Sequence, residues 1–550
     1  EKTGVGFPRN VLLIDALLSL NLLGLTRLAA KVLSVSSQDK STSVALGSRS
    51  AAPRKVLLVG AGDAGAAIAA EMRRNPGLGL LPVGFIDDDP RKRGVFVQGI
   101  KVLGTRKEIP DLVPDTGAEQ VLMTMPSSPG HVIRDTVSLC RQAGVPCRTV
   151  PGIHELIDGS VSVRETRDVR IEDLLRREPV NIDVAAVAGY LNGARVLVTG
   201  AGGSIGSELC RHIERFSPEL LILLGHGENS IYRIQMELDR RRPDLSIVPA
   251  IADIRDADRV RAVMAQYLPT VVFHAAAHKH VPLMETHASE VITNNVLGTR
   301  ILLRAAEKAG VARFIFVSTD KAADPVNLLG ATKRLGEILV CNAAHRSGRA
   351  YAAVRFGNVL GSRGSVVPLF LDQIAAGGPI TITHPEVARY FMPIPEAARL
   401  IIQAGALSEG GEVFILDMGE PVKIVDLVAD LVRLSDLRLG QDIGVVFTGL
   451  RPGEKLREIL FTEEELATAV RRRGVLVSRL ARVVDVDRHV SALEELARRG
   501  DSEAILAKLR EMLAGYQPVQ TMSHQLSVAT RQGQGGEDLY SSACDRTTGP

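Results

Sequence analysis

The sequence has no tryptophan, and aromatic residues make up only 4% of its 550 residues. Proteins that bind single-stranded nucleic acid stack bases on aromatic rings, and those that bind duplexes carry a pronounced positive charge. The formal net charge here is only +3. The composition therefore argues against a nucleic-acid partner.

Cysteine is scarce as well: the chain has five, without a Cys-x-x-Cys pair or a cluster of cysteines with histidines. Disulfide frameworks use paired cysteines, and structural zinc sites use clustered ones. The odd count favours reduced thiols in a cytosolic compartment. With 23% charged and 45% hydrophobic residues, a chain of this length can bury more than one core.

Long hydrophobic runs are almost absent. The segment from Val11 to Leu25 is apolar, but it is shorter than the about 20 residues that a membrane helix needs, and it contains an Asp and an Asn. Two interpretations of residues 1–34 stay open: a buried or interfacial helix, or the last of several membrane helices with a basic cytoplasmic flank. Residues 35–53 are rich in Ser, Gln, Lys and Gly, which predicts a linker.

A first glycine-rich loop, Gly60-x-Gly62-x-x-Gly65, follows an apolar run and precedes a helical pattern. Glycines at this spacing let a backbone approach a phosphate at a helix N-terminus, and acidic residues follow about 20 positions later. The same glycines also serve tight helix packing, so a bound nucleotide stays open. Strands and helices alternate onwards, which predicts a Rossmann-like domain over 54–150 and a connector over 151–193.

A second loop carries Gly200, Gly203 and Gly206 between an apolar strand and a helix. Its backbone N–H groups and the helix dipole suit the pyrophosphate of a dinucleotide. The next strand, 220–224, would usually end in an acid that holds the ribose hydroxyls, but Gly225 stands there. The choice between NAD and NADP therefore stays open.

Other residues should complete this dinucleotide site. An acid ending the third strand can reach the adenine edge, and small residues after the fourth strand let the cofactor pass. We expect the site to comprise Gly200, Gly203, Ser204, Ile205, Gly206, Asp253, Ile254, Ala275, Ala276 and Lys333. His274, His278 and His280 follow a strand into a loop without a carboxylate in the pattern, so we predict no metal site.

The most informative stretch is a strand ending in Ser318, Thr319, Asp320 and Lys321, followed by a helix with Lys333. Ligands of open α/β sheets bind beyond the carboxyl ends of the strands. Adjacent residues there point in different directions, so the Asp and the Lys can address neighbouring substrate atoms.

These motifs resemble the extended short-chain dehydrogenases, which place a Tyr one helical turn before the Lys, where this chain has Leu329. More narrowly, the chain resembles the nucleotide-sugar 4,6-dehydratases of bacterial polysaccharide and glycoprotein biosynthesis. The runs that carry this resemblance are His278–Glu285, Ser318–Ala322, Val354–Gly361, Ile382–Met392 and Leu450–Lys455. Long members of this family also lack the Tyr, and they carry membrane helices and an additional Rossmann-like domain.

The resemblance implies an α/β fold with two Rossmann-like, doubly wound parallel-sheet domains in tandem. The second, over 194–516, would be an extended short-chain dehydrogenase with a smaller C-terminal substrate-binding subdomain. Residues 517–550 are rich in Ser, Gly, Gln and Thr and are expected to be disordered.

The implied reaction is NAD(P)-dependent 4,6-dehydration of a UDP-N-acetylhexosamine, above all UDP-N-acetylglucosamine. Oxidation at C4 acidifies C5; by resemblance, Asp320 is then the acid for the C6 hydroxyl and Lys321 the C5 base. Asp320 must therefore be protonated and Lys321 neutral, against ordinary pKa values of about 3.9 and 10.4. Thr319, alone or through water or another base, replaces the missing Tyr, and Lys333 binds the nicotinamide ribose.

Residues beyond the dinucleotide loop should hold the substrate, because Arg offers bidentate donors to a diphosphate. The candidates are Lys279, His280, Asn358, Arg363, Arg389, Arg451 and Glu454. We further expect a homo-oligomer at the inner membrane with cytoplasmic catalytic domains. The alternatives are an epimerase or reductase on the same scaffold, or a nucleotide-sugar-binding protein without activity.

Overall fold

The computed structural model describes residues 52–151, 163, 166–175, 183–472, 475–480, 482–513 and 515–517. The apolar segment expected at 1–34, nearly all of the linker and nearly all of the C-terminal tail lie outside the described residues. Within the described ranges, no helix combines the length and apolar character needed to cross a bilayer.

The first sheet has seven strands in the order β3-β4-β2-β1-β5-β6-β7. Its strands are β1 (Arg54–Val59), β2 (Leu80–Ile86), β3 (Phe96–Val97), β4 (Ile100–Gly104), β5 (Gln120–Met123), β6 (Cys147–Thr149) and β7 (Arg167–Asp168), and its helices are α2 (Asp63–Arg74), α3 (Ile109–Thr116) and α4 (Gly130–Gln142). β1 and β5, β5 and β6, and β2 and β4 pair in parallel. The Rossmann-like prediction for this domain is confirmed, and the antiparallel strand β7 adds a part of the connector to the sheet.

The acid expected near the first glycine loop contacts the loop itself. The Asp87 carboxylate accepts the backbone N–H of Ala61 at 2.8 Å and pairs with Lys92 at 2.8 Å. Gly60 has a φ of +107°, and a Cβ there would meet the Met125 side chain at 2.3 Å. This glycine is therefore required by packing within the domain, whether or not a nucleotide binds.

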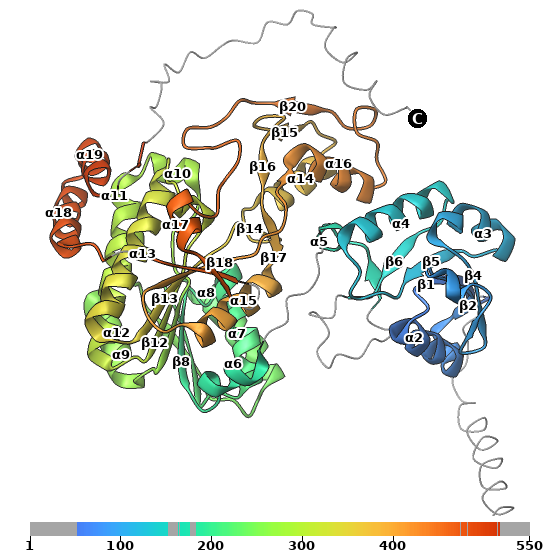
Figure 1. The fold of residues 1–550 in the computed structure, drawn as a ribbon, viewed down its shortest axis with the longest axis horizontal. Helices are drawn as coiled ribbons and strands as arrows, with labels where there is room; N and C mark the ends of the chain where they lie inside the picture. Colours follow the sequence, from blue (N-terminus) through green and yellow to red (C-terminus); the bar gives the residue numbers. More distant parts are fainter. Residues whose placement is uncertain are drawn as a thin grey trace, which may run out of the picture. The chain divides into compact units, whose positions relative to one another are not determined.

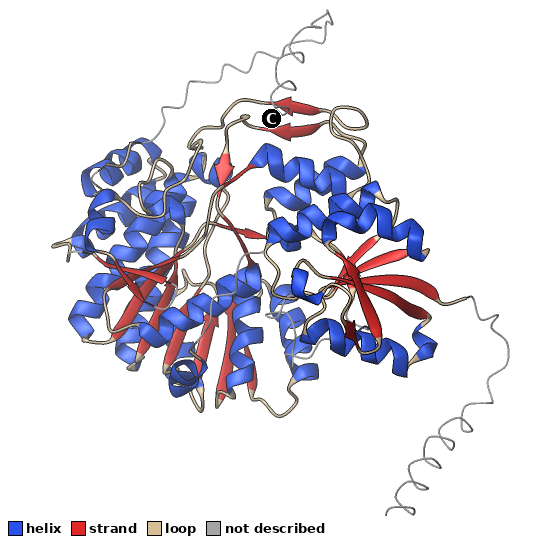
Figure 2. Cartoon of the chain, turned by 45° about the vertical axis from the view of Figure 1, so that its right-hand side comes forward, coloured by secondary structure: helices blue, strands red, loops and turns tan. Residues whose placement is uncertain are grey.

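The second sheet has nine strands in the order β10-β9-β8-β11-β12-β13-β18-β22-β21 (Figures 1 and 2). Its strands are β8 (Arg195–Thr199), β9 (Leu220–Gly225), β10 (Ile247–Ile251), β11 (Val271–His274), β12 (Arg313–Val317), β13 (Ala350–Arg355), β18 (Glu412–Leu416), β21 (Val470–Arg472) and β22 (Val475–Arg479). The strands from β10 to β18 are parallel, and β22 and β21 are antiparallel additions. The chain reverses direction across the sheet between β8 and β11, which is the switch point where ligands bind in such folds.

Helices lie against both faces of this sheet (Figure 2). The helices of this domain are α6 (Val184–Leu191), α7 (Ser204–Ile213), α8 (Glu228–Arg241), α9 (Ala257–Tyr267), α10 (Val281–Glu285), α11 (Ala288–Val291), α12 (Gly298–Ala309), α13 (Leu328–Ser347), α15 (Ile394–Leu407), α18 (Val486–Arg499) and α19 (Ser502–Met512), with a π-helical turn at Ile292–Leu297. Of these, α18 and α19 pack on each other and on α11. Because both faces are covered, the central strands are almost continuously apolar and buried. α18 and α19 are amphipathic, with Val490, Leu493, Ile505 and Leu509 among their buried residues.

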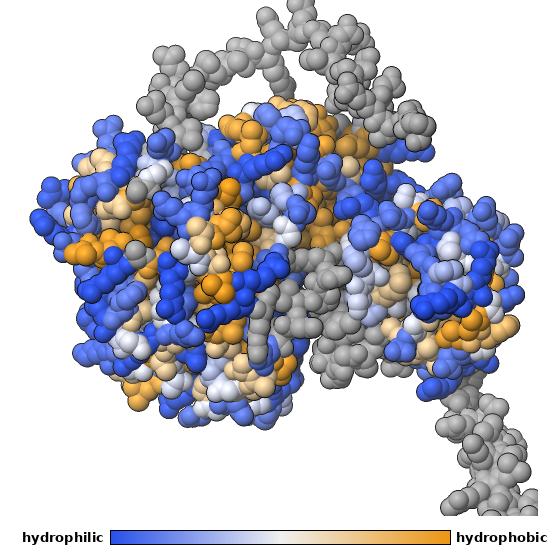
Figure 3. All heavy atoms as spheres, viewed as in Figure 1, coloured by the Kyte–Doolittle hydropathy of each residue, from blue (hydrophilic) through white to orange (hydrophobic). Residues whose placement is uncertain are grey.

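Segments of the chain before and after β18 form a smaller subdomain. It contains α14 (Val366–Ala375), α16 (Ile424–Leu434), and the strand pairs β14 (Asn358–Leu360) with β17 (Phe391–Pro393), β15 (Ile380–Ile382) with β20 (Val445–Phe447), and β16 (Ala388–Arg389) with β19 (Val422–Lys423). The short helix α17 (Glu463–Thr468) then leads back to the main sheet. The face drawn in Figure 3 is mostly hydrophilic, with separate apolar patches.

Candidate active site

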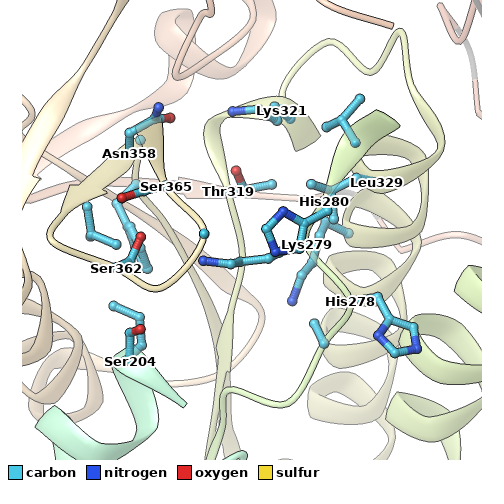
Figure 4. A pocket seen from close by; sticks show the side chains of 18 of the residues that line it. Ser204, His278, Lys279, His280, Thr319, Lys321, Leu329, Asn358, Ser362 and Ser365 are labelled. Atoms are coloured by element: carbon cyan, nitrogen blue, oxygen red, sulfur yellow. The ribbon is translucent and has the colours of Figure 1, made fainter. Parts of the chain in front are cut away.

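A cavity of about 690 Å³ lies at the carboxyl ends of the second sheet. Its wall combines the second glycine loop, the segment after β11, the end of β12, the start of α13 and parts of the small subdomain. Figure 4 shows Thr319, Lys321 and Leu329 toward one end of the cavity and Ser204 toward the other. A cavity of this size is typical of small-molecule and cofactor sites.

The glycine loop is shaped by close backbone contacts. Gly200 has a φ of +64°, and a Cβ there would lie 2.9 Å from the Ala276 backbone. A Cβ on Gly206 would lie 2.1 Å from the carbonyl oxygen of Gly200. The cradle at the N-terminus of α7 therefore depends on the absence of side chains, which fits a phosphate held on backbone N–H groups.

The residues predicted to bind the dinucleotide divide into three groups. Those that line the cavity are Gly203, Ser204, Ile205, Gly206, Ala275 and Lys333, while Gly200 and Ala276 form the contact beneath the loop. Asp253 and Ile254 are not in its wall. The Arg255 guanidinium, 2.8 Å away, holds the carboxylate of Asp253 and lowers its pKa, and Ile254 is buried in the core.

Thr319, Asp320 and Lys321 form one hydrogen-bonded group. The Thr319 hydroxyl donates to Asp320 Oδ1 at 2.8 Å, and Lys321 Nζ donates to the same oxygen at 2.9 Å. Asp320 is only 1% exposed, and its second oxygen, Oδ2, is buried without a hydrogen-bond partner among the described residues. The pair is therefore a buried part of the site and does not lie on the surface.

The protein groups around Lys321 favour its charged form, whereas the expected reaction needs the neutral amine. Burial opposes its charge, but the carboxylates of Asp320 and Glu458 outweigh burial and hold the pKa of Lys321 above its usual value. The site thus keeps this lysine protonated, and the reaction needs a way to remove that proton.

Lys333 is the lysine whose proton is held weakly. Its Nζ donates to the Val317 carbonyl at 2.7 Å and lies 4.5 Å from the centre of the Phe316 ring. Burial lowers the pKa of Lys333 to about 7, although Glu337 opposes this. Leu329, 5% exposed, lines the cavity at the position where related enzymes carry a phenol.

Glu458 is a site residue that the sequence interpretation missed. Its side chain is 3% exposed, and its Oε1 lies 3.7 Å from Lys321 Nζ. Burial raises the pKa of Glu458, while Lys321 opposes this shift. The run Leu450–Lys455, which was used for the family resemblance, ends three residues before Glu458. Extending that run to the next acidic residue would have included Glu458.

The predicted substrate residues all reach the same cavity: Lys279, His280, Asn358, Arg363, Arg389, Arg451 and Glu454. Glu454 differs in role, because its Oε1 accepts from Arg389 at 3.1 Å and from the Thr383 hydroxyl at 3.1 Å. It therefore orients Arg389. Lys279 donates to the Arg363 carbonyl at 2.7 Å, and burial lowers the pKa of Lys279.

The histidines after β11 have separate environments. His274 is buried between the hydroxyls of Thr199 and Thr299, at 2.7 and 2.9 Å, and burial lowers its pKa to about 3. Asn295 Oδ1 accepts the backbone N–H of His278 at 2.8 Å, and its Nδ2 donates to the His278 carbonyl at 3.0 Å, so this amide fixes the backbone after β11. In the part of the chain that the structure describes, no three His, Cys, Asp or Glu side chains are grouped to hold a metal.

The family described as "Polysaccharide biosynthesis protein" matches residues 196–479, more than half of the sequence. The chain belongs to this family. A second match, described as a CoA-binding domain, covers residues 5–151 and so includes the first Rossmann-like domain.

Relatives in this polysaccharide biosynthesis family differ in their named activities. The capsular polysaccharide biosynthesis protein CapD of Staphylococcus aureus is 46% identical over 416 residues, which cover 75% of this chain and 69% of CapD. An inverting UDP-N-acetylglucosamine 4,6-dehydratase of Campylobacter jejuni is 32% identical over 279 residues, 50% of this chain and 79% of that protein. A UDP-glucose 4-epimerase of Rickettsia canadensis is 34% identical over 284 residues, with the same two coverages.

Among solved structures, Pen from Bacillus thuringiensis is similar to the chain with a TM-score of 0.50 and 33% identity. The similarity covers 53% of this chain and 89% of Pen. The relatives therefore support an enzyme of the nucleotide-sugar dehydratase and epimerase group on an extended short-chain dehydrogenase fold.

Proposed function

We propose that the protein is an NAD(P)-dependent 4,6-dehydratase that converts a UDP-N-acetylhexosamine, first of all UDP-N-acetylglucosamine, to the 4-keto-6-deoxy sugar nucleotide. The observation that carries the proposal is the buried group of Thr319, Asp320 and Lys321 in the wall of the cavity that also contains the glycine loop. A dehydration needs a proton acceptor and a proton donor next to each other, and this group contains both.

The residues of the second domain fit the dinucleotide. Gly200 and Gly206 leave room for a pyrophosphate on the backbone N–H groups of the loop, and Lys333 reaches the cavity beside Leu329. When bound, the nicotinamide supplies a hydride acceptor for C4 and a hydride donor for C6. Gly225 leaves no acid for the ribose hydroxyls at the end of β9, so both NAD and NADP are to be tested.

The hydrogen bond from Thr319 to Asp320 gives the C4 hydroxyl proton a route. Thr319 Oγ1 accepts that proton while its own proton passes to Asp320 Oδ1, 2.8 Å away. Asp320 becomes a carboxylic acid by this step and then has the proton that the departing C6 hydroxyl requires. This relay replaces the missing phenol and protonates the acid in one step.

Lys321 completes the proton balance. As a neutral amine it takes the C5 proton and returns it to C5 after water has left. By the end of the cycle Asp320 is a carboxylate again and Lys321 is again the neutral amine that it must become before it can take the C5 proton, so these steps neither gain nor lose a proton. Arg363, Arg389 and Arg451, which also line the cavity, would hold the diphosphate of the substrate.

An epimerase is the second candidate, because one of the relatives is a UDP-glucose 4-epimerase. A 4-epimerase ordinarily uses a Tyr at the position where this chain has Leu329. It also needs no acid at C6 and no base at C5. The buried Asp320–Lys321 pair therefore favours dehydration.

The test is incubation of the protein with UDP-N-acetylglucosamine in deuterated water, followed by proton NMR. A 4-keto-6-deoxy product with deuterium at C5 would support the proposal, and its couplings give the C5 configuration. A C4 epimer without deuterium would establish the epimerase instead. An unchanged sugar with bound dinucleotide would favour a binding protein or another substrate.

We also propose that the protein works as a homo-oligomer at the inner membrane with its catalytic domains in the cytoplasm. The apolar segment within residues 1–34 supports the membrane part of this proposal. Membrane fractionation of cells that express the full chain, with and without residues 1–34, tests it. Recovery of both forms in the soluble fraction would contradict the membrane assignment.

A further inference from the structure

Glu458 is buried, although apolar residues next to it in the sequence are exposed. It is 5% exposed, whereas the apolar side chains Leu456 and Ile459 on either side are 39% and 41% exposed. Ordinary folding would bury the two apolar groups and leave the carboxylate in water. A local inversion of this kind is expected where function, and not stability, decides which side chain faces inward.

The backbone around Glu458 is fixed on both sides. Before it, the Leu456 carbonyl accepts the backbone N–H of Ala388 at 2.9 Å and Arg389 Nη1 at 3.1 Å. After it, the Leu460 carbonyl accepts Arg355 Nη1 at 3.3 Å. The carboxylate is therefore held toward Lys321.

The other charged groups that face this pair have partners of their own. Arg389, on β16, pairs with Glu454 at 3.1 Å, and Lys455 pairs with Asp324 at 2.7 Å. Lys321 is left between two carboxylates, Asp320 at 2.9 Å and Glu458 at 3.7 Å. Asp320 must accept the proton that arrives through Thr319, so it is not free to take one from Lys321.

We propose that Glu458 takes up the proton of Lys321 when the site fills, so that Lys321 becomes the neutral amine that removes the C5 proton. This inference rests on the proposed dehydratase function. One Nζ–H bond of Lys321 breaks and an O–H bond of Glu458 forms; the lone pair on Nζ then takes the C5 proton and later returns it. Glu458 acts through Lys321 and is a positioning residue.

The geometry allows this transfer with a small movement. A proton moves between heavy atoms at hydrogen-bond distance, about 2.7–3.2 Å, so the present 3.7 Å has to shorten by less than about 1 Å. Burial already disfavours the ionised form of Glu458. A cationic nicotinamide and a buried substrate disfavour a second positive charge on Lys321 as well.

A proton that moves within a pair gives a characteristic pH dependence. While Lys321 and Glu458 together hold one proton, the fraction with a neutral lysine does not depend on pH. If Glu458 is replaced by an uncharged group, the proton must leave to solvent. The neutral fraction then rises about tenfold with each pH unit until the pKa of Lys321 is reached.

The experiment compares the pH profile of kcat for 4-keto-6-deoxy product formation in the full chain and its variants. Lys333, with its pKa of about 7, contributes equally to the profile of every variant, so kcat is compared as the ratio of variant to wild type at each pH. For Glu458→Gln we expect a ratio of about 10⁻² at pH 7 that rises about tenfold per pH unit, with KM little changed. For Glu458→Asp we expect a reduced ratio that does not change between about pH 6.5 and 8.5, on the order of the range between the two titrations of the pair.

A matched control is Glu511→Gln, which breaks the exposed Lys508–Glu511 pair on α19 and should leave the profile unchanged. A loss of kcat in Glu458→Gln that is the same at every pH, or no loss, would overturn the proposal.

A second measurement separates this proposal from the proposed function. In the protein without substrate, the Lys321 Cε resonance is followed by NMR with pH in lysine-labelled wild type and Glu458→Gln, and is assigned with Lys321→Arg. The titration of Lys321 should move to lower pH in Glu458→Gln, because a neighbouring negative charge is lost. If the titration of Lys321 does not move, Lys321 and Glu458 are not coupled and the proposal about Glu458 fails. A wild-type protein that leaves the sugar unchanged would instead refute only the proposed dehydratase function.

Discussion

Arg355 is the most deeply buried charge of the second domain, and its removal should be costly. Its side chain is 0% exposed and donates to both oxygens of Glu337, each at 2.6 Å, and to those of Glu465 at 2.7 and 2.9 Å. Glu337 lies on α13 and Glu465 on α17, so this one guanidinium joins two helices beneath the site. The Ser318 hydroxyl also donates to Glu337, at 2.6 Å, which links the network to the end of β12.

The substitution Arg355→Met leaves two carboxylates, 0% and 7% exposed, without this partner. Breaking a buried ion pair from one side typically costs about 3–5 kcal/mol. Arg334 stays 2.7 Å from Glu465 and 3.2 Å from Glu337, so we expect a loss of about 3 kcal/mol in the free energy of unfolding.

The measurement is urea unfolding of the full chain, followed by circular dichroism because the chain has no tryptophan. The transition that shifts with added dinucleotide reports the second domain. As a control, Glu337→Gln and Glu465→Gln are added to Arg355→Met, which removes the unpaired charges and should recover part of the loss. A loss below about 1 kcal/mol in Arg355→Met, or a further loss in the triple variant, would refute this reasoning.

Three further predictions follow from the site and its support. Burial alone would raise the pKa of Glu465, but Arg355 lowers it from 4.5 to about 2, so its stabilisation is complete above about pH 4.5 and is lost as pH falls toward 2. Glu465→Gln should flatten the fall in Tm over that range. Thr319→Val should lower kcat about 10²-fold with unchanged dinucleotide affinity, and Thr319→Ser should keep most of the activity. Gly206→Ala should abolish dinucleotide binding, measured by calorimetry, because its Cβ would lie 2.1 Å from the Gly200 carbonyl oxygen.

Each of these has a contrary outcome. An unchanged Tm profile in Glu465→Gln would mean that this carboxylate titrates normally in the folded protein. Full activity in Thr319→Val would exclude the relay to Asp320. Normal dinucleotide affinity in Gly206→Ala would show that the loop can accommodate a Cβ at this position despite the close Gly200 carbonyl.

Most of the fold could be predicted because it depends on periodicity and glycine spacing. The apolar strand before Gly200 and the helix after Gly203 define the start of the parallel sheet of the second domain. The cluster from Thr319 to Lys321 was found because three polar residues end an apolar strand. Local patterns of this kind are visible before any tertiary contact is known.

The protonation of Lys321 and the presence of Glu458 could not be predicted in the same way. Glu458 meets Lys321 across a large separation in sequence, and its own segment would predict Leu456 and Ile459 as the buried residues. The role of Asp253 at the adenine stays a prediction; the sequence did not show that its neighbour Arg255 binds it locally. Electrostatic effects depend on which charges come together in three dimensions.

Leu329 also has a consequence for selective inhibition. It places an apolar surface in the cavity beside Lys333, where dehydrogenases of the common type present a phenolic hydroxyl. A ligand that covers Leu329 with a bulky apolar group would gain contact here, but in a Tyr-containing enzyme it would bury that hydroxyl without a partner. Such an unsatisfied group costs roughly 1–3 kcal/mol, or about 5- to 150-fold in affinity. The residue that removes the usual acid–base group therefore also distinguishes this site from its Tyr-containing relatives as a target for small molecules.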